Sequence, residues 1–143
     1  MSLKNWDTRF IDLAKLVSTW SKDPSTKVGA VITDVNNRVI SVGYNGFPKK
    51  IQDNDRLFDR QTKYNIVVHA EANALMFASK SVKECTLYTY PFEPCPKCAS
   101  LIIQSGITRV VSIPNTNERW EKDFQMSRSL FSEAGVLLEY NYE

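Results

Sequence analysis

The chain has 143 residues, of which 18 are Lys or Arg and 16 are Asp or Glu, and 43% are hydrophobic. This length predicts one domain, residues 1–143, that buries its own core. The net charge of +2 is too small to indicate a nucleic-acid partner. No apolar stretch approaches the ~20 residues of a membrane helix, so we expect no membrane partner. Three Cys, one His and no apolar signal segment in residues 1–6 favour a cytoplasmic location, the host cytoplasm if the source is viral.

The first part of the chain predicts a helix and a β-hairpin. Apolar residues at helical spacing indicate an amphipathic helix over residues 5–20. Residues 28–33 and 38–44 are rich in β-branched residues and flank a turn, which predicts two paired strands. Residues 47–65 are polar and weakly periodic, and they predict a long surface loop with a helical turn near 56–60.

Helices and strands alternate through the rest of the chain. The expected segments are a buried helix at 69–79, a strand at 85–90, a helix at 96–104, a strand at 108–113, a helix at 120–134 and a strand at 136–140. This alternation predicts a largely parallel sheet covered by helices on both faces.

Two short motifs lie at the starts of predicted helices. Residues 69–71 read His-Ala-Glu, and residues 94–98 read Pro-Cys-Pro-Lys-Cys. A catalytic zinc takes three protein ligands, nitrogen or sulfur, and one water. His69, Cys95 and Cys98 supply such a set, and a helix N-terminus favours the thiolate form of cysteine.

Other readings of the cysteines are weaker. A lone C-x-x-C also fits a redox pair or half of a structural zinc site. A structural site needs a fourth ligand, and the remaining thiol, Cys85, lies inside a predicted strand, where a buried inert thiol is the expected role. Glu71 favours catalysis, because a carboxylate two residues past a ligand reaches the open coordination position and suits proton transfer.

The two motifs together match H-x-E…P-C-x-x-C, the signature of zinc nucleobase deaminases. Over residues 6–140 the sequence resembles the cytidine/deoxycytidylate deaminase superfamily, and within it the deoxycytidylate (dCMP) deaminases. The segments that carry the resemblance are 21–30 (SKDPSTKVGA), 43–48 (GYNGFP), 62–64 (TKY), 69–74 (HAEANA) and 101–107 (LIIQSGI).

The resemblance implies a three-layer α/β/α fold with a five-stranded mixed sheet, an N-terminal helix and a β-hairpin. It implies hydrolysis of dCMP to dUMP, the precursor of dTMP, with one catalytic Zn²⁺ per chain. Glu71 is then the proton shuttle, the Ala70 amide contacts the base, and Asn45 contacts the sugar. A structural turn role for Asn45 remains open, because Asn-Gly is a strong turn signal.

Other substrates and roles also remain open. The same chemistry could act on dCTP, cytidine, a free base or adenosine in tRNA, and a zinc module could bind nucleotide without turnover. Phosphate recognition has two sets of candidates, Ser21, Lys22 and Lys27 in one loop and Arg119 and Trp120 in another. The alternatives are ordinary surface lysines and a tryptophan that anchors the last helix.

Regulation and assembly are expectations from the resemblance alone. It implies a homo-oligomer, a hexamer in preference to a dimer, and dCTP or dTTP effectors, with Mg²⁺, at Gly43, Tyr44, Asn45 and Gly46. The sequence departs from the family at residues 91–94, which precede the first zinc cysteine, and at 115–128. Residues 47–65 carry no His or Cys for a second zinc.

Overall fold

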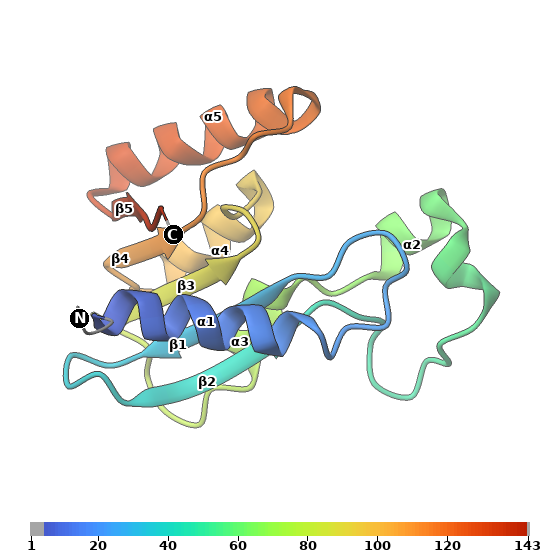
Figure 1. Ribbon diagram of the computed structural model, residues 1–143, viewed down its shortest axis with the longest axis horizontal. Helices are drawn as coiled ribbons and strands as arrows, with labels where there is room; N and C mark the ends of the chain where they lie inside the picture. The colour runs from blue at the N-terminus through green and yellow to red at the C-terminus, as the bar shows by residue number, and fades with distance from the viewer. Residues whose placement is uncertain (1–4, 143) are drawn as a thin grey trace, which may run out of the picture.

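A five-stranded mixed sheet forms the centre of the computed structural model, which describes residues 5–142 (Figure 1). The strand order is β2-β1-β3-β4-β5, and the bounds are β1 Gly29–Thr33, β2 Val39–Tyr44, β3 Thr86–Tyr90, β4 Arg109–Ser112 and β5 Leu137–Tyr140. β1 is antiparallel to both of its neighbours, whereas β3, β4 and β5 run parallel. The sheet is therefore mixed, and the expectation of a largely parallel sheet holds only for its second half. The expectation that residues 1–6 hold no apolar signal segment falls mostly on residues 1–4, which lie outside the described residues.

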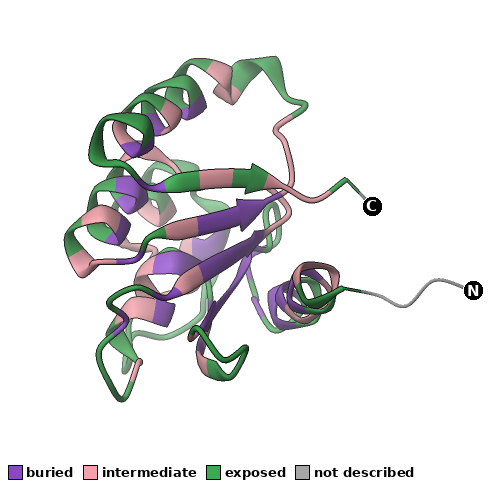
Figure 2. Cartoon of the chain, turned by 90° about the vertical axis from the view of Figure 1, so that its left-hand side faces the viewer, coloured by how far each residue is buried: buried purple, intermediate pink, exposed green. Residues whose placement is uncertain are grey.

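Helices cover both faces of this sheet. The helices are α1 Trp6–Ser18, a 3-10 turn η1 at Asp55–Phe58, α2 Arg60–Ile66, α3 Ala70–Met76, α4 Pro96–Ser105 and α5 Glu118–Ala134. Figure 2 shows α1 alone on one side of the sheet and the other long helices on the opposite side. This arrangement confirms the predicted three-layer α/β/α fold.

Alternate residues of β1 explain how one strand serves two cores. Val31 packs with Phe10 and Ala14 on the α1 side. Ala30 and Ile32 point the other way and join the core formed by α3, α4 and α5. All five residues of β1 are buried, as expected for a strand covered on both faces.

The predicted loop at 47–65 contains a helix that the sequence pattern does not reveal. α2 has no buried residue, so it lacks the apolar periodicity by which a helix is recognised. It is capped by the Asp59 carboxylate, which accepts from the Thr62 backbone N–H at 3.4 Å and from its hydroxyl at 3.0 Å. An isolated antiparallel bridge between Gly46 and Val68 joins the two ends of the segment 47–67.

Two other predicted boundaries shift. α3 ends at Met76, and the side chains of Met76 and Phe77 are 73% and 55% exposed, so the helix is shorter and less buried than expected. α5 begins two residues early, because Asn117 caps it by accepting from the Arg119 N–H at 3.0 Å. None of the described helices is long and apolar enough to cross a membrane.

Glycines set the spacing between helices and sheet. A Cβ at Gly29 would lie well inside van der Waals contact with the Ala14 carbonyl oxygen of α1. A Cβ at Gly43 would clash in the same way with the Ala70 carbonyl and the Ala74 amide of α3. Both clashes are with backbone, so neither can be relieved by a side-chain rotation.

We expect Gly29→Ala to destabilise the protein by about 2 kcal/mol or more, because α1 must move off the sheet to admit the methyl group. Gly46→Ala is the matched control, since nothing lies within 4 Å of a Cβ there, and its effect should stay within about 0.5 kcal/mol. Urea denaturation of both variants measures the difference, and equal midpoints would contradict the close approach.

Candidate metal centre and active site

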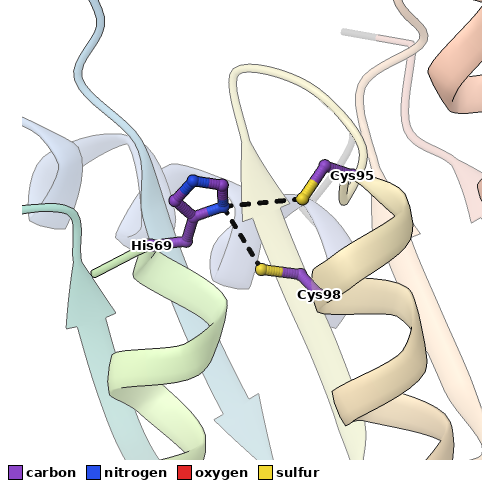
Figure 3. Close-up of side chains that lie close together, drawn as sticks. All are labelled: His69, Cys95 and Cys98. Carbon is purple, nitrogen blue, oxygen red and sulfur yellow. Dashed lines mark hydrogen bonds between the residues drawn. The ribbon is translucent and has the colours of Figure 1, made fainter. Parts of the chain in front are cut away.

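The starts of two helices bring three potential ligands together. His69 is the N-cap residue of α3, Cys95 is the N-cap residue of α4, and Cys98 lies in the first turn of α4. Neither N-cap residue makes a side-chain capping hydrogen bond. Figure 3 shows the two sulfurs turned toward the His69 ring, with Nδ1 3.5 Å from Cys95 Sγ and 3.4 Å from Cys98 Sγ.

The chemistry of this donor set fits zinc. One nitrogen and two sulfur atoms lie within 4.8 Å of one another, the number and type of protein ligands that a catalytic zinc takes. A hydrogen bond from Cys98 lowers the pKa of Cys95 to about 4, with further help from His69. The same pairing raises the pKa of Cys98. Metal binding releases thiol protons, because cysteine binds a metal as the thiolate.

Glu71 lies two residues beyond His69, in the first turn of α3. Its side chain is buried, and that burial, followed by the negative charge of Cys95, raises its pKa to about 7. The preceding residue, Ala70, is fully buried, and its N–H is among the first-turn donors that have no partner within the helix. An acid and a backbone donor therefore stand at one side of the ligand set.

A cavity of about 500 Å³ opens in front of these groups. The lining residues are Asp23, Ser25, Thr26, Val28, Asn45, Arg60, Lys63, Tyr64, Val67, His69, Ala70, Glu71, Phe92, Glu93, Cys95, Arg119, Trp120, Asp123 and Phe124. They come from the α1–β1 loop, the residue after β2, α2 and the residues that follow it, the start of α3, the β3–α4 connector and the start of α5. This volume suits a small organic ligand of nucleotide size.

The structure separates the predicted substrate contacts into two groups. Arg119 and Trp120 line the cavity, with the guanidinium carbon 5.2 Å from the centre of the Trp120 ring system. Ser21, Lys22 and Lys27 are not among the residues that line it.

Each of these three side chains has another partner. The Ser21 hydroxyl donates to the Asn45 carbonyl at 2.9 Å, and Lys27 Nζ donates to the Ser21 carbonyl at 2.6 Å. Lys22 points to solvent and pairs with Asp53 at 3.2 Å. The loop therefore uses these groups to hold its own shape.

Asn45 lines the cavity, and its amide also braces the loop. Its Oδ1 accepts from the Val28 N–H at 2.9 Å, and its Nδ2 donates to the Thr26 carbonyl at 2.9 Å. These bonds agree with the structural role left open from the sequence. Nδ2 also donates a long hydrogen bond, 3.5 Å, to Asp23 Oδ2.

α2 contributes cavity residues that the sequence reasoning missed as contacts. Arg60, Lys63 and Tyr64 lie on a helix that was expected to be loop. Lys63 Nζ pairs with Asp23 at 3.0 Å, so it joins α2 to the α1–β1 loop across the cavity. The signal present in the sequence is the TKY segment at 62–64, which carried part of the resemblance but had no role assigned.

Comparisons with known proteins agree with this geometry. Residues 4–113 match the family described as the cytidine and deoxycytidylate deaminase zinc-binding region. An uncharacterized deaminase of Aliivibrio fischeri is 44% identical over 137 residues, covering 94% of this chain and 92% of that protein. The mouse deoxycytidylate deaminase is 40% identical over 138 residues, covering 92% of this chain and 76% of the mouse protein.

A solved structure shows the same fold. The dCMP deaminase of cyanophage S-TIM5, in complex with dCMP and dUMP, superposes with a TM-score of 0.81. The match has 25% identity and covers 98% of this chain and 100% of that one. Fold and donor set together define a zinc-binding α/β/α domain with a buried acid at the metal. The chain belongs to the cytidine and deoxycytidylate deaminase family.

We expect wild-type protein to hold about one zinc ion per chain, and Cys95→Ser or Cys98→Ser to lose most of it, since a hydroxyl is a poor replacement for a thiolate ligand. Cys85→Ser is the matched control, because this buried thiol lies outside the donor set. Elemental analysis of the purified proteins gives the ratio directly. Retention of full zinc by both ligand variants would rule out this site.

Proposed function

We propose that this chain catalyses the hydrolytic deamination of dCMP to dUMP, with one zinc ion held by His69, Cys95 and Cys98. The observation that carries the proposal is the convergence of three metal donors within 4.8 Å beside the buried Glu71, inside a nucleotide-sized cavity. The names of the mouse and cyanophage relatives support dCMP as the substrate. The reaction adds water at C4 of the cytosine ring and releases the amino group as ammonia.

The protein's own groups divide the chemistry between them. When bound, zinc acts as a Lewis acid that lowers the pKa of a coordinated water to near 7. Glu71 takes one proton from the water and gives it to ring N3. It then takes the hydroxyl proton of the C4 adduct and gives it to the leaving amino group, so that ammonia departs and the C4 carbonyl forms. The Ala70 amide donates to the base, and Asn45 contacts the sugar.

Glu71 is singled out by how the other cavity carboxylates are used. Asp23 pairs with Lys63 at 3.0 Å, and Glu93 pairs with an arginine at 2.7 Å, so both carboxylates are neutralised by fixed partners. Asp123 is exposed on α5. Glu71 is buried next to the ligand His69 and is the acid best placed for proton transfer at the metal.

The phosphate is proposed to bind between the start of α2 and the start of α5. Arg60 and Arg119 both line it, whereas the ammonium of Lys63 is already paired with Asp23. Arginine suits a phosphate dianion because its guanidinium donates two parallel hydrogen bonds. Trp120, adjacent to Arg119, is proposed to cover the nucleotide.

Finer expectations extend this proposal. We propose a single deaminase domain over residues 1–143 that works in the cytoplasm as a homo-oligomer, a hexamer in preference to a dimer. We further propose that dCTP and dTTP, with Mg²⁺, act at Gly43–Gly46. The exposed Tyr44 ring, whose centre lies 6.0 Å from that of Trp20, supports an effector site there. Gly43 already has a packing role against α3.

Ammonia release from dCMP, dCTP, cytidine and tRNA, measured side by side on the zinc-loaded protein, tests the substrate. Turnover of dCMP alone or by a wide margin supports the proposal. Turnover of another substrate but not of dCMP would show that the protein deaminates that substrate instead. No turnover of any substrate would favour a zinc module that binds nucleotide without catalysis. Adding dCTP or dTTP to the dCMP assay tests the effectors.

We expect Glu71→Gln to reduce kcat by about 100-fold or more while zinc stays bound, because general acid–base catalysis contributes that much and the side chain is not a ligand. Glu133→Gln, an exposed site on α5, is the control and should keep the wild-type rate. Stopped assays for dUMP and elemental analysis for zinc report the two effects separately. A near-normal rate in Glu71→Gln would exclude it as the proton shuttle.

We expect Arg119→Gln to lower kcat/KM for dCMP by about 10- to 100-fold, since one charged hydrogen bond to phosphate contributes ~1.5–3 kcal/mol. Arg38→Gln, in the exposed β1–β2 turn, removes the same charge away from the cavity and should leave kcat/KM unchanged. Equal effects of the two substitutions would show that overall charge, and not a contact at Arg119, is responsible.

A further inference from the structure

One buried carboxylate lies beside the metal centre without a place in the reaction. Glu93 is 1% exposed and stands two residues before the ligand Cys95, in the connector between β3 and α4. This connector is where the sequence departs from the family pattern. A buried carboxylate is costly unless its oxygens are fully hydrogen-bonded, so its partners indicate what it does.

Four hydrogen bonds satisfy both oxygens of Glu93. Arg128 of α5 binds bidentately, with Nε 2.9 Å from Oε1 and Nη2 2.7 Å from Oε2. The Tyr140 hydroxyl at the end of β5 donates to Oε1 at 3.0 Å. The Asn115 backbone N–H in the β4–α5 loop donates to Oε2 at 3.3 Å. One side chain of the metal-ligand connector therefore holds three separate segments of the C-terminal part.

A second carboxylate extends the network to the start of α5. Glu121 accepts from Arg128 Nη1 at 2.7 Å and from the Asn115 side-chain amide at 3.2 Å. That first stretch of α5 also carries Arg119 and Trp120, which line the cavity. The ring of Phe92, next to Glu93, lies 5.8 Å from the ring of Phe124 and closes the same wall.

We propose that Glu93 is a positioning residue that fixes the start of α5 against the connector holding Cys95. The carboxylate sets how far the α5 wall stands from the metal centre, and so how tightly the nucleotide is held. It does not touch the reacting atoms, because both of its oxygens are taken by Arg128, Tyr140 and Asn115. The kinetic part of this proposal rests on the proposed function.

The chain offers a matched control of the same chemistry. Asp7 of α1 also binds an arginine and a tyrosine: Arg109 donates to both of its oxygens at 3.0 and 2.6 Å, and Tyr88 donates at 2.7 Å. None of these three residues lines the cavity. Asp7 is more exposed than Glu93, with side-chain exposures of 32% and 0%. Asp7→Asn therefore breaks a carboxylate cluster away from the active site.

The experiment compares Glu93→Gln with Asp7→Asn in the zinc-loaded protein. An amide at residue 93 keeps the size of the side chain but turns a donor toward Arg128. We expect Glu93→Gln to raise KM for dCMP by about tenfold or more with kcat within about threefold, while zinc content is unchanged. Asp7→Asn should leave KM at the wild-type value. Arg128→Lys, which keeps the positive charge but loses the bidentate hydrogen bonding of the guanidinium, should raise KM to an intermediate value.

Amide hydrogen exchange of residues 115–124 gives a readout that needs no substrate. Exchange in this segment should speed up in Glu93→Gln and stay unchanged in Asp7→Asn. An unchanged KM and exchange rate in Glu93→Gln would overturn the proposal, and so would equal effects of the two variants or loss of zinc from Glu93→Gln. If Glu93→Gln does not fold, Arg128→Lys carries both measurements. Absence of dCMP turnover by wild type bears on the proposed function, and the exchange comparison still decides the role of Glu93.

Discussion

The position of two helix starts at one end of the sheet is the constraint on which the site depends. His69 caps α3 and Cys95 caps α4, so a shift of either helix along the sheet moves a metal donor. The β1–β3 pairing places Tyr90, from which the connector to Cys95 leaves, opposite Gly29. Close backbone approach at Gly43 then fixes how near α3 lies to β2. Sheet register and the α3–β2 distance thus help to set the spacing of the three donors, which zinc tolerates only within a few tenths of an ångström.

Two of the carboxylates around the cavity are paired with cations, a feature that the net charge of the chain does not reveal. The chain as a whole carries only +2. Two cavity carboxylates, Asp23 and Glu93, are each matched by a cation fixed beside them, Lys63 and an arginine of α5. This pairing leaves the guanidinium groups that line the cavity available for the proposed phosphate contact. Local pairing, rather than an excess of basic residues, makes such a cavity suited to one small anion.

The sequence predicts those parts of the structure that depend on local spacing. The C-x-x-C pair and the His-x-Glu pair lie within one helical turn each, so their geometry follows from a helix start. α2 was missed because it has no apolar face. Ser21 and Lys22 were expected at the substrate because their residue types suit phosphate. Their direction depends on tertiary partners 24 and 31 residues away, Asn45 and Asp53, which no local pattern reveals.

The same limit applies to Glu93, and it explains why its role emerges only from the folded chain. Its partners Asn115, Arg128 and Tyr140 are 22, 35 and 47 residues away. All three also lie beyond residues 4–113, the part that matches the zinc-binding family. Removing one member of a buried ion pair typically costs ~3–5 kcal/mol, so this cluster ties the C-terminal segment firmly to the metal-ligand connector. A segment outside the shared zinc-binding region thereby supplies one wall of the cavity. Glu93 fixes the position of that wall relative to the metal ligands.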